Sequence, residues 1–450
     1  MNDNKLGFTL KSGVKAVKFG GSSLADAGQI EKVKKIITAD EDRRYVIPSA
    51  PGKRFDGDVK ITDLFYRCFE MSEEDLPIDP VFDEITKRYN GIIEELDIDV
   101  DISEKLTNIK YAITNHAGRD FAASRGEYLN GFILSKLLGF HFIDAARVIK
   151  FKEDGTFDGA TTNALLSEKL SQHYRAVIPG FYGAMPNGTI KTFSRGGSDV
   201  TGAIVAAAAK AAVYENWTDV SGFLMADPHV VKDPAGIDVI TYRELRELSY
   251  MGATVLHEDS VFPVRAAGIP INIKNTNAPD HSGTFIVPDT SFSDSDKTIT
   301  GIAGKKGFSV IAIEKDMLHS ERGVGRAVLE AVEKEGLSFE HLPSGIDTMS
   351  VIVSGEISNE ARCRVTARIR ETVKPDSITF EDGLALIAVV GRGMIKNKGT
   401  AAKVFKACAD KDINIRMIDQ GSSEINIIIG VAESDFETAL NAIYREFVKN

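Results

Sequence analysis

The chain has 450 residues, of which 43% are hydrophobic, and its 54 basic and 65 acidic side chains give a formal net charge of −11. This length suggests about three domains, and the hydrophobic content suffices for folded cores. The acidic balance without a basic block argues against a nucleic-acid-binding surface and favours small-molecule partners.

No apolar run of signal-peptide or membrane-spanning length is present, and the longest one, Ala203 to Val213, is broken by Lys210. We therefore expect a cytoplasmic protein that neither crosses nor enters a membrane. The odd number of distant cysteines fits a reducing compartment, and we interpret them as packing residues: Cys68, Cys363 and Cys408. The eight histidines show no ligand spacing, so we predict no metal-binding cluster.

The chain opens with a strand, a glycine turn and a helix. Val14 to Phe19 reads as the strand, Gly20-Gly21-Ser22-Ser23 as the turn and Ala25 to Thr38 as an amphipathic helix. Lys18 precedes the glycines, so the pattern is not a P-loop. A lysine that ends a strand beside such a turn can neutralise a transferring phosphoryl group, although by itself it also fits a surface lysine on an edge strand.

The next part alternates helices with short strands. Tyr45 to Ile47 is a strand, Lys60 to Thr107 is an acidic helical excursion, and Phe142 to Asp144 and Ala176 to Ile178 are further strands. This alternation predicts a largely parallel sheet covered on both faces, with ligands at the carboxyl ends of the strands. Glu127, early in an apolar helix, either complements the helix dipole or receives a ligand ammonium.

The stretch Thr192 to Lys210 organises the candidate site. It passes from β-branched residues through Ser194-Arg195-Gly196-Gly197-Ser198-Asp199 into an alanine-rich helix. The helix N-terminus and its glycines form a natural anion site. An ordinary strand-to-helix connection with Ser198 or Asp199 as N-cap is the simpler interpretation, but the flanking Arg195 and Asp199 favour phosphate or carboxylate chemistry.

Seven short motifs together resemble the aspartate kinases of the amino acid kinase fold, in that family's order over about 240 residues. They are Lys18 to Ser23, Ser124 to Glu127, Gly180-Phe181, Arg195 to Asp199, Trp217 to Val220, Asp227-Pro228 and Val255 to His257. The resemblance implies Mg²⁺-dependent transfer of the ATP γ-phosphoryl group to the side-chain carboxylate of L-aspartate. It also implies the roles of individual residues.

Lys18 and Asp199 correspond to the family's catalytic pair. The implied aspartate-binding residues are Ser49, Thr62, Glu127, Phe181, Arg195, Gly196 and Ser198, with Arg195 for a carboxylate and Glu127 for the amino group. The implied ATP-binding residues are Lys18, Gly20, Gly21, Ser22, Thr218, Asp219, Leu224 and His229.

Three positions depart from the family pattern, because Leu224, His229 and Thr254 stand where many members carry tyrosine, arginine and lysine. These departures keep two alternatives open beside the kinase interpretation: a regulatory-only paralogue, or an amino-acid sensor whose cleft binds without catalysis. A related kinase with another acceptor, such as glutamate, is the third alternative.

After a polar linker at Pro279 to Asp296, the chain repeats itself with an offset of 76, as in Gly323 and Gly399 (399 − 323 = 76) or Val328 and Val404 (404 − 328 = 76). Each copy reads strand, helix, strand, strand, helix, which is typical of ferredoxin-like βαββαβ modules. The predicted divisions are a catalytic domain at 1–295 and modules at 296–380 and 381–450. The second copy lacks its closing strand, and we expect residues 298–303 to supply it, which would interlock the modules.

Paired in this way, the modules resemble the ACT domains of aspartate kinases, which bind amino acids and join subunits. The resemblance implies an effector, with lysine the leading candidate beside threonine, and a homodimer or homotetramer joined through the edge strands of these modules. The implied effector residues are Met317, Ser320, Gly323, Val324, Phe339 and Glu340. Because no third domain follows Asn450, we expect a monofunctional kinase without a fused homoserine dehydrogenase.

Overall fold

The computed structural model describes residues 8, 11–194, 196–253, 256, 261–288 and 297–448. They form two compact units, the first comprising residues 1–223, 237–242 and 254–293, and the second residues 224–236, 243–253 and 294–450. The second unit thus includes two segments that precede the predicted linker. The predicted domain boundary at residue 295 lies outside the described residues and stays a prediction.

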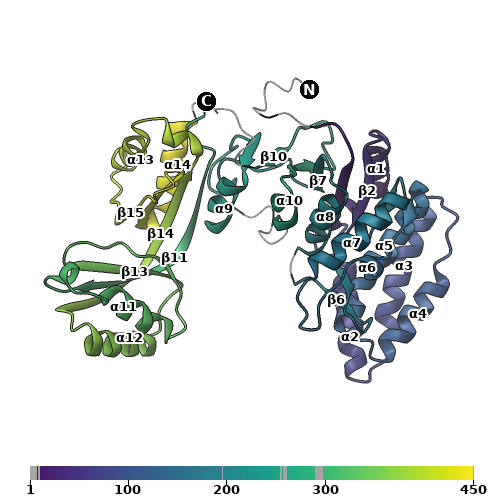
Figure 1. The fold of residues 1–450 in the computed structure, drawn as a ribbon, viewed down its shortest axis with the longest axis horizontal. Helices are drawn as coiled ribbons and strands as arrows, with labels where there is room; N and C mark the ends of the chain where they lie inside the picture. The colour runs from purple at the N-terminus through teal and green to yellow at the C-terminus, as the bar shows by residue number, and fades with distance from the viewer. Residues whose placement is uncertain are drawn as a thin grey trace. The chain divides into compact units, whose positions relative to one another are not determined.

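The first unit is built on an eight-stranded sheet in the order β3-β4-β2-β1-β7-β9-β10-β8 (Figure 1). Its strands are β1 (Lys15–Phe19), β2 (Arg43–Pro48), β3 (His141–Phe142), β4 (Ala176–Val177), β7 (Val213–Thr218), β8 (Val239–Thr241), β9 (Ile271–Asn275) and β10 (Thr284–Val287). Within the described residues, every neighbouring pair is parallel except β9 and β10. The predicted, mainly parallel sheet is confirmed. A separate hairpin joins β5 (Tyr182–Ala184) to β6 (Ile190–Thr192).

The helices of the first unit cover both faces of this sheet or pack on the helices that do. They are α1 (Ala27–Thr38), α2 (Ile61–Glu73), α3 (Asp79–Glu95), α4 (Ser103–Thr114), α5 (Arg119–Leu138), α6 (Ala145–Val148), α7 (Gly159–Gln172), α8 (Gly197–Ala208) and α10 (Phe262–Ala266). The predicted apolar face of α1 is buried against the sheet together with parts of α3 and α5. Helix α8 packs with α7 and α10 and lies against β1 and β7. The acidic excursion consists of α2, α3 and α4, which share a core with α5.

Local signals set several element boundaries. Asp26 caps α1 by accepting a hydrogen bond from the Gln29 N–H, as expected of an N-cap aspartate. The predicted strand at Phe142 to Asp144 is shorter, because the Asp144 side chain instead caps α6. The cysteine interpretation holds for the buried Cys68 and Cys408 and is wrong for the exposed Cys363.

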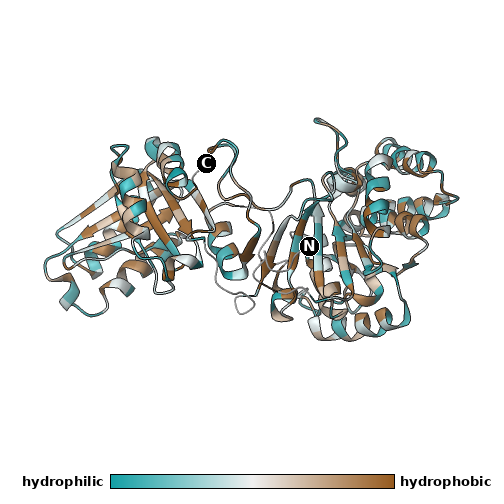
Figure 2. Cartoon of the chain, turned by 90° about the horizontal axis from the view of Figure 1, so that it is seen from above, coloured by the Kyte–Doolittle hydropathy of each residue, from teal (hydrophilic) through white to brown (hydrophobic). Residues whose placement is uncertain are grey.

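The second unit contains a continuous six-stranded sheet in the order β12-β13-β11-β14-β16-β15. Its strands are β11 (Gly301–Glu314), β12 (Phe339–His341), β13 (Thr348–Ser354), β14 (Ser377–Val390), β15 (Met417–Asp419) and β16 (Asn426–Ala432), and its helices are α9 (Tyr242–Tyr250, its first residue assigned to the first unit), α11 (Val324–Glu333), α12 (Asn359–Thr372), α13 (Thr400–Ala409) and α14 (Phe436–Phe447). Figure 2 shows hydrophobic residues gathered on these strands and mixed polarity on the helices. The two ferredoxin-like modules of the predicted fold class are confirmed, and they share one sheet.

Strands β11 and β14 run through both modules. Residues 308–314 of β11 pair with β13 and with the first half of β14, whereas Gly301–Lys305 pair with Leu386–Val390 of β14 beside β16. Gly323 and Gly399 open α11 and α13 with the same φ of 87°, in agreement with the repeat. In the described part of the chain, no helix is long and apolar enough to span a membrane.

Candidate functional site

An ion pair joins β1 to the first turn of α8. Lys18 Nζ lies 2.6 Å from Asp199 Oδ1, and the two side chains are only 10% and 19% exposed. Partial burial lowers the screening of this attraction by water. The structure therefore brings together the two residues that the family resemblance paired, at the carboxyl end of the central strands, where open parallel sheets bind ligands.

Asn216 is a third member of this group, which the sequence analysis did not single out. It stands opposite Lys18 in the register of β1 and β7 and is buried. Its Nδ2 donates to Asp199 Oδ1 at 2.9 Å, and its Oδ1 accepts a hydrogen bond of 3.4 Å from Lys18 Nζ. The only sequence signal was strand alternation, which places Asn216 on the opposite face from Glu215 and Trp217.

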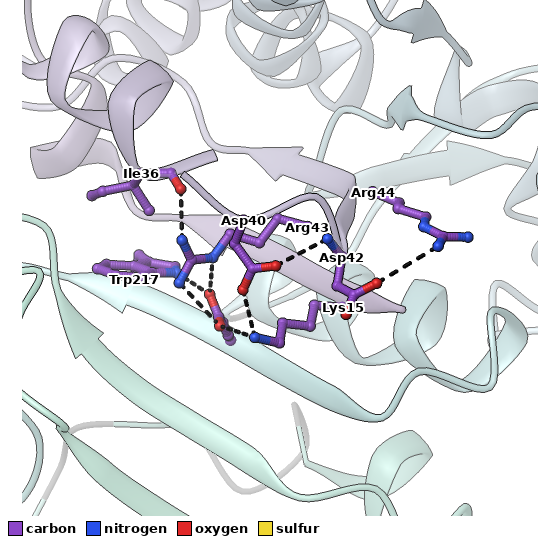
Figure 3. Close-up of polar contacts among 8 residues, drawn as sticks. Lys15, Ile36, Asp40, Asp42, Arg43, Arg44 and Trp217 are labelled. Atoms are coloured by element: carbon purple, nitrogen blue, oxygen red, sulfur yellow. Dashed lines mark hydrogen bonds and ion pairs between the residues drawn. The ribbon is translucent and has the colours of Figure 1, made fainter. Parts of the chain in front are cut away.

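A network of charged side chains fixes the opposite face of β7 (Figure 3). The buried Glu215 carboxylate accepts from Arg43 Nε and from Trp217 Nε1, each at 2.8 Å. Lys15 Nζ lies 3.7 Å from Glu215 and 2.6 Å from Asp40. These contacts link β7 to β1 and β2, so they hold the register that places Asn216 beside Lys18.

The glycine turn after β1 packs directly on a second backbone segment. The Gly20 N–H donates to the Trp217 carbonyl at 2.9 Å, and the Gly52 N–H donates to the Gly21 carbonyl at 2.8 Å. A Cβ on Gly52 would lie 2.6 Å from the Gly21 carbonyl carbon and 2.8 Å from the Ser22 nitrogen. The turn that carries Gly20, Gly21 and Ser22 therefore depends on Gly52, which the sequence analysis missed because the approach joins separate loops.

Glu127 is a buried carboxylic acid on α5, only 5% exposed. Burial raises its pKa to about 8, although nearby backbone N–H groups, including that of Ala50, and the Arg125 guanidinium act in the opposite direction. Within the described residues, its Oε2 has no hydrogen-bond partner. Ser49, which follows β2 directly, precedes Ala50, and Thr62 lies in the first turn of α2. A ligand cation beside Glu127 would favour the ionised form.

The loop after β4 packs against the start of α8. Phe181 has a φ of 83°, and its N–H donates to Thr201 Oγ1 at 3.0 Å. A Cβ on Gly180 would lie 2.6 Å from Ser198 Oγ, and one on Gly197 would lie 2.4 Å from Phe181 Cδ2. This close packing leaves no room for side chains larger than glycine between the loop and the helix.

The start of α8 differs from the simpler sequence interpretation. Gly196, with a φ of 55°, occupies the N-cap position without a side-chain cap, so neither Ser198 nor Asp199 has that role. Glycine adopts this left-handed conformation at little cost, and Asp199 is left free to pair with Lys18. Arg195 lies outside the described residues.

The predicted nucleotide residues divide between the two units. Thr218 ends β7, and its hydroxyl donates to Asp219 Oδ1 at 3.1 Å, so both lie at the same end of the sheet as Lys18. Leu224 and His229 belong to the second unit: Leu224 is 42% exposed, and His229 Nδ1 lies 2.9 Å from the Asp227 carboxylate. Thr254, Val255 and His257 lie outside the described residues.

The predicted effector residues gather around the start of α11 and on edge strand β12. Met317 is 62% exposed and has a φ of 61°, and Ser320 Oγ donates to the Met317 carbonyl at 2.8 Å. Gly323 caps α11, and Val324 is buried. Phe339 is 49% exposed and does not simply pack the core, and Glu340 accepts a hydrogen bond from the Tyr250 hydroxyl.

Comparison with known families agrees with this architecture. The model of the amino acid kinase family matches residues 13–275, and an ACT domain model matches residues 387–447. Aspartokinase 3 of Bacillus subtilis (strain 168) is 37% identical, over 96% of this chain and 98% of that protein. A chloroplastic bifunctional aspartokinase/homoserine dehydrogenase 1 of Zea mays is 27% identical, over 96% of this chain and 50% of that protein.

Solved structures show the same fold. The crystal structure of Clostridium acetobutylicum aspartate kinase superposes with a TM-score of 0.89 at 53% identity, covering 97% of this chain and 99% of that one. Escherichia coli aspartokinase III, crystallised in complex with aspartate and ADP, superposes with a TM-score of 0.70 at 24% identity, covering 96% of this chain and 99% of that one. At that identity, the second likeness extends to the fold alone.

Proposed function

This chain belongs to the aspartokinase family, and we propose that it transfers the γ-phosphoryl group of ATP to the side-chain carboxylate of L-aspartate, forming 4-phospho-L-aspartate. The observation that carries this proposal is the Lys18–Asp199 pair beside the glycine turn of β1. Phosphoryl transfer is catalysed mainly by positioning and charge stabilisation. A lysine, backbone donors and a carboxylate at one strand end match that requirement.

The proposed catalytic roles belong to Lys18 and Asp199. The Lys18 ammonium would stabilise negative charge on the transferring phosphoryl oxygens, and Asp199 would hold that ammonium in place. The turn of Gly20, Gly21 and Ser22 would contact the phosphates, and Thr218 and Asp219 would contact the nucleotide. The aspartate carboxylate itself is the nucleophile, so no protein nucleophile is needed.

Magnesium fits this donor set. Mg²⁺ usually keeps several waters and binds through substrate phosphates with one or two carboxylates. Asp199 and Asp219 are carboxylates at this end of the sheet. Among the described residues, no cluster of three or more His, Cys, Asp or Glu side chains could hold a metal ion, so the phosphates would supply the other ligands. When bound, the ion would neutralise charge on the phosphates.

The proposed aspartate site lies around Glu127, in the third turn of α5, and the start of α8. Arg195 would bind a substrate carboxylate through its planar fork of donors, and Glu127 would bind the ammonium. Ser49, Thr62, Phe181, Gly196 and Ser198 would complete the site. The packing of Gly180-Phe181 on the first turn of α8 supports this grouping. So does Glu127 Oε2, which has no hydrogen-bond partner among the residues that the structure describes.

We further propose that the paired modules bind an amino acid that inhibits the kinase, with lysine as the leading effector. The kinase would then catalyse the first step of a pathway to lysine, threonine and methionine and be inhibited by a product of that pathway. Escherichia coli aspartokinase III has been crystallised with lysine and aspartate in a T-state. The exposed Met317 and Phe339 support a site around α11. The edge strands β12 and β15 would join copies of this chain into a homodimer or homotetramer. The free cysteines fit a cytoplasmic location.

The test is formation of an acyl phosphate, trapped with hydroxylamine, from Mg²⁺–ATP and either aspartate or glutamate, with and without lysine and threonine. We expect product from aspartate alone and its suppression by lysine. Lys18→Ala is the control, and it should lower kcat by about 10² or more. No product from either acceptor, despite amino-acid binding by calorimetry, would make the chain a sensor, and product from glutamate alone would reassign the acceptor.

A further inference from the structure

Two buried acceptor groups lie on one face of α5. Glu127 and Asn130 are 5% and 1% exposed, and residues three apart on a helix are neighbours on its surface. Within the described residues, neither Glu127 Oε2 nor Asn130 Oδ1 receives a hydrogen bond. Both side chains lie near the residues that follow β2, where the Ala50 N–H acts on the Glu127 carboxyl group and Asn130 contacts Ser49.

The orientation of the Asn130 amide follows from its one hydrogen bond. Its Nδ2 donates to the Ser49 carbonyl at 2.6 Å. A carbonyl oxygen can only accept, so the amide nitrogen must face Ser49 and the amide oxygen must point away from it. The hydrogen bond to Ser49 therefore fixes the orientation of the Asn130 amide, and with it the direction in which Oδ1 can accept a hydrogen bond.

Leaving a buried acceptor without a donor costs about 1–3 kcal/mol, so two such acceptors on one helix face indicate a missing donor. A cation with at least two N–H groups would satisfy both acceptors and favour ionised Glu127, and the primary ammonium of an amino acid is such a cation. We propose that Asn130 and Glu127 together bind the α-ammonium group of the acceptor amino acid, with Asn130 supplying a neutral oxygen beside the charged one. This inference rests on the proposed function for the identity of the acceptor.

The assignment gives Asn130 a role in specificity. A dicarboxylate without an ammonium group would leave both acceptors unpaired, and sites built to hydrogen-bond a substrate group reject analogues that lack it. Succinate is aspartate without its amino group, so the ratio of the two dissociation constants reports this contact. A purely structural Asn130, holding only Ser49, would affect both ligands alike.

The experiment measures aspartate and succinate binding to the full chain by calorimetry, in wild type, Asn130→Leu and Asn130→Asp. Both substitutions keep the approximate shape and remove the amide donor to Ser49, but only aspartate at this position keeps an acceptor. We expect Asn130→Leu to lower the preference for aspartate over succinate by about tenfold or more. Asn130→Asp should keep that preference within about threefold. Ser135→Ala is the matched control, because among the described residues this buried hydroxyl on α5 bonds to the Phe132 carbonyl of its own helix.

Equal loss of both ligands in Asn130→Leu, or equal loss of preference in the two variants, would overturn the assignment. If Asn130→Leu fails to fold by circular dichroism, Asn130→Asp decides alone, because a lost preference there contradicts the proposal and a retained one supports it. If the wild-type protein binds aspartate no better than succinate, aspartate is not the substrate that this site recognises. The proposed contact between Asn130 and the substrate ammonium then fails as well. Normal aspartate preference in wild type with unchanged preference in Asn130→Leu would overturn only the contact.

Discussion

Lys18 and Asn216 face each other on β1 and β7, and both contact the same carboxylate oxygen of Asp199. The amide of Asn216 therefore closes a ring around the ion pair and limits the positions of the ammonium. Replacing Asn216 with leucine keeps the approximate volume and removes both contacts. We expect kcat to fall about 10-fold to 100-fold with little change in the KM for aspartate, since a positioning contact is lost.

The control for this prediction is Tyr214→Phe. The Tyr214 hydroxyl donates to the backbone carbonyl of Asp199 at 3.1 Å and is not bonded to its carboxylate. Steady-state kinetics should show near-normal kcat for this variant. Similar losses in both variants would mean that general support of α8, and not the carboxylate contact, is what matters.

Substituting alanine for Gly52 should damage the phosphate side of the site. The new Cβ would meet backbone atoms of Gly21 and Ser22 at less than 3 Å, and backbone cannot move aside as a flexible side chain can. We expect the KM for ATP to rise by about tenfold or more and stability to fall by about 1–3 kcal/mol. Gly91→Ala, at a helical position on α3 with no atom nearby, is the control and should stabilise slightly. An unchanged KM for ATP in Gly52→Ala would show that this turn does not contribute to nucleotide binding.

Glu127 makes both stability and substrate binding depend on pH. Its pKa of about 8 in the folded protein lies above the ordinary value of 4.5. Between pH 4.5 and pH 8 the folded state therefore binds one more proton at Glu127 than the unfolded state does. The free energy of unfolding falls as pH rises through this range. Relative to Glu127→Gln, wild-type stability should fall by up to about 1.4 kcal/mol per pH unit in this window.

Denaturant unfolding at pH 5.5 and pH 8 checks this slope. Glu127→Gln should be the more stable protein at pH 8 and should bind aspartate far more weakly, because the charge for the ammonium is gone. The KM for aspartate in wild type should also fall as pH rises through about 8. Parallel stability curves for the two proteins would show that Glu127 is already ionised when the site is empty.

The shared strands of the two modules predict the outcome of a truncation. A chain ending at Asp382 would lose residues 383–390 of β14, so Gly301–Lys305 of β11 would lose their strand partner. Exposed strand edges favour aggregation. We expect this chain to elute as aggregate by size exclusion, whereas a chain ending at Val448 elutes as the full protein does. A monodisperse, active truncated kinase would show that the modules fold separately.

The sequence predicted the features that depend on residues close together in the chain, and it missed those that depend on contacts between distant segments. The strand, turn and helix around Lys18, and the 76-residue repeat, follow from local patterns and were found. Asn216 and Gly52 matter through partners on distant segments, so nothing next to them in the chain marks them. Gly196 replaced Ser198 and Asp199 as N-cap because Asp199 has a long-range partner in Lys18, and tertiary pairing overrides a capping preference.

The segment Leu224–Gly236 illustrates the same limit. By position it follows the sheet strand β7, and the sequence analysis placed it in the catalytic domain. It packs instead with the C-terminal helix, because Asn441 Nδ2 donates to the Val230 carbonyl and Tyr444 accepts from the Ala235 N–H. Neither partner could be identified without the fold.

The continuous strands β11 and β14 also bear on how the repeat can change over evolutionary time. The second module borrows Gly301–Lys305 of β11, which precede all the elements of the first module in the chain. A gene crossover within the repeat would join half-strands whose alternation of inward and outward side chains need not agree, and a shift of one residue would turn each inward residue outward. The two copies can diverge in side chains, but they can be exchanged only together.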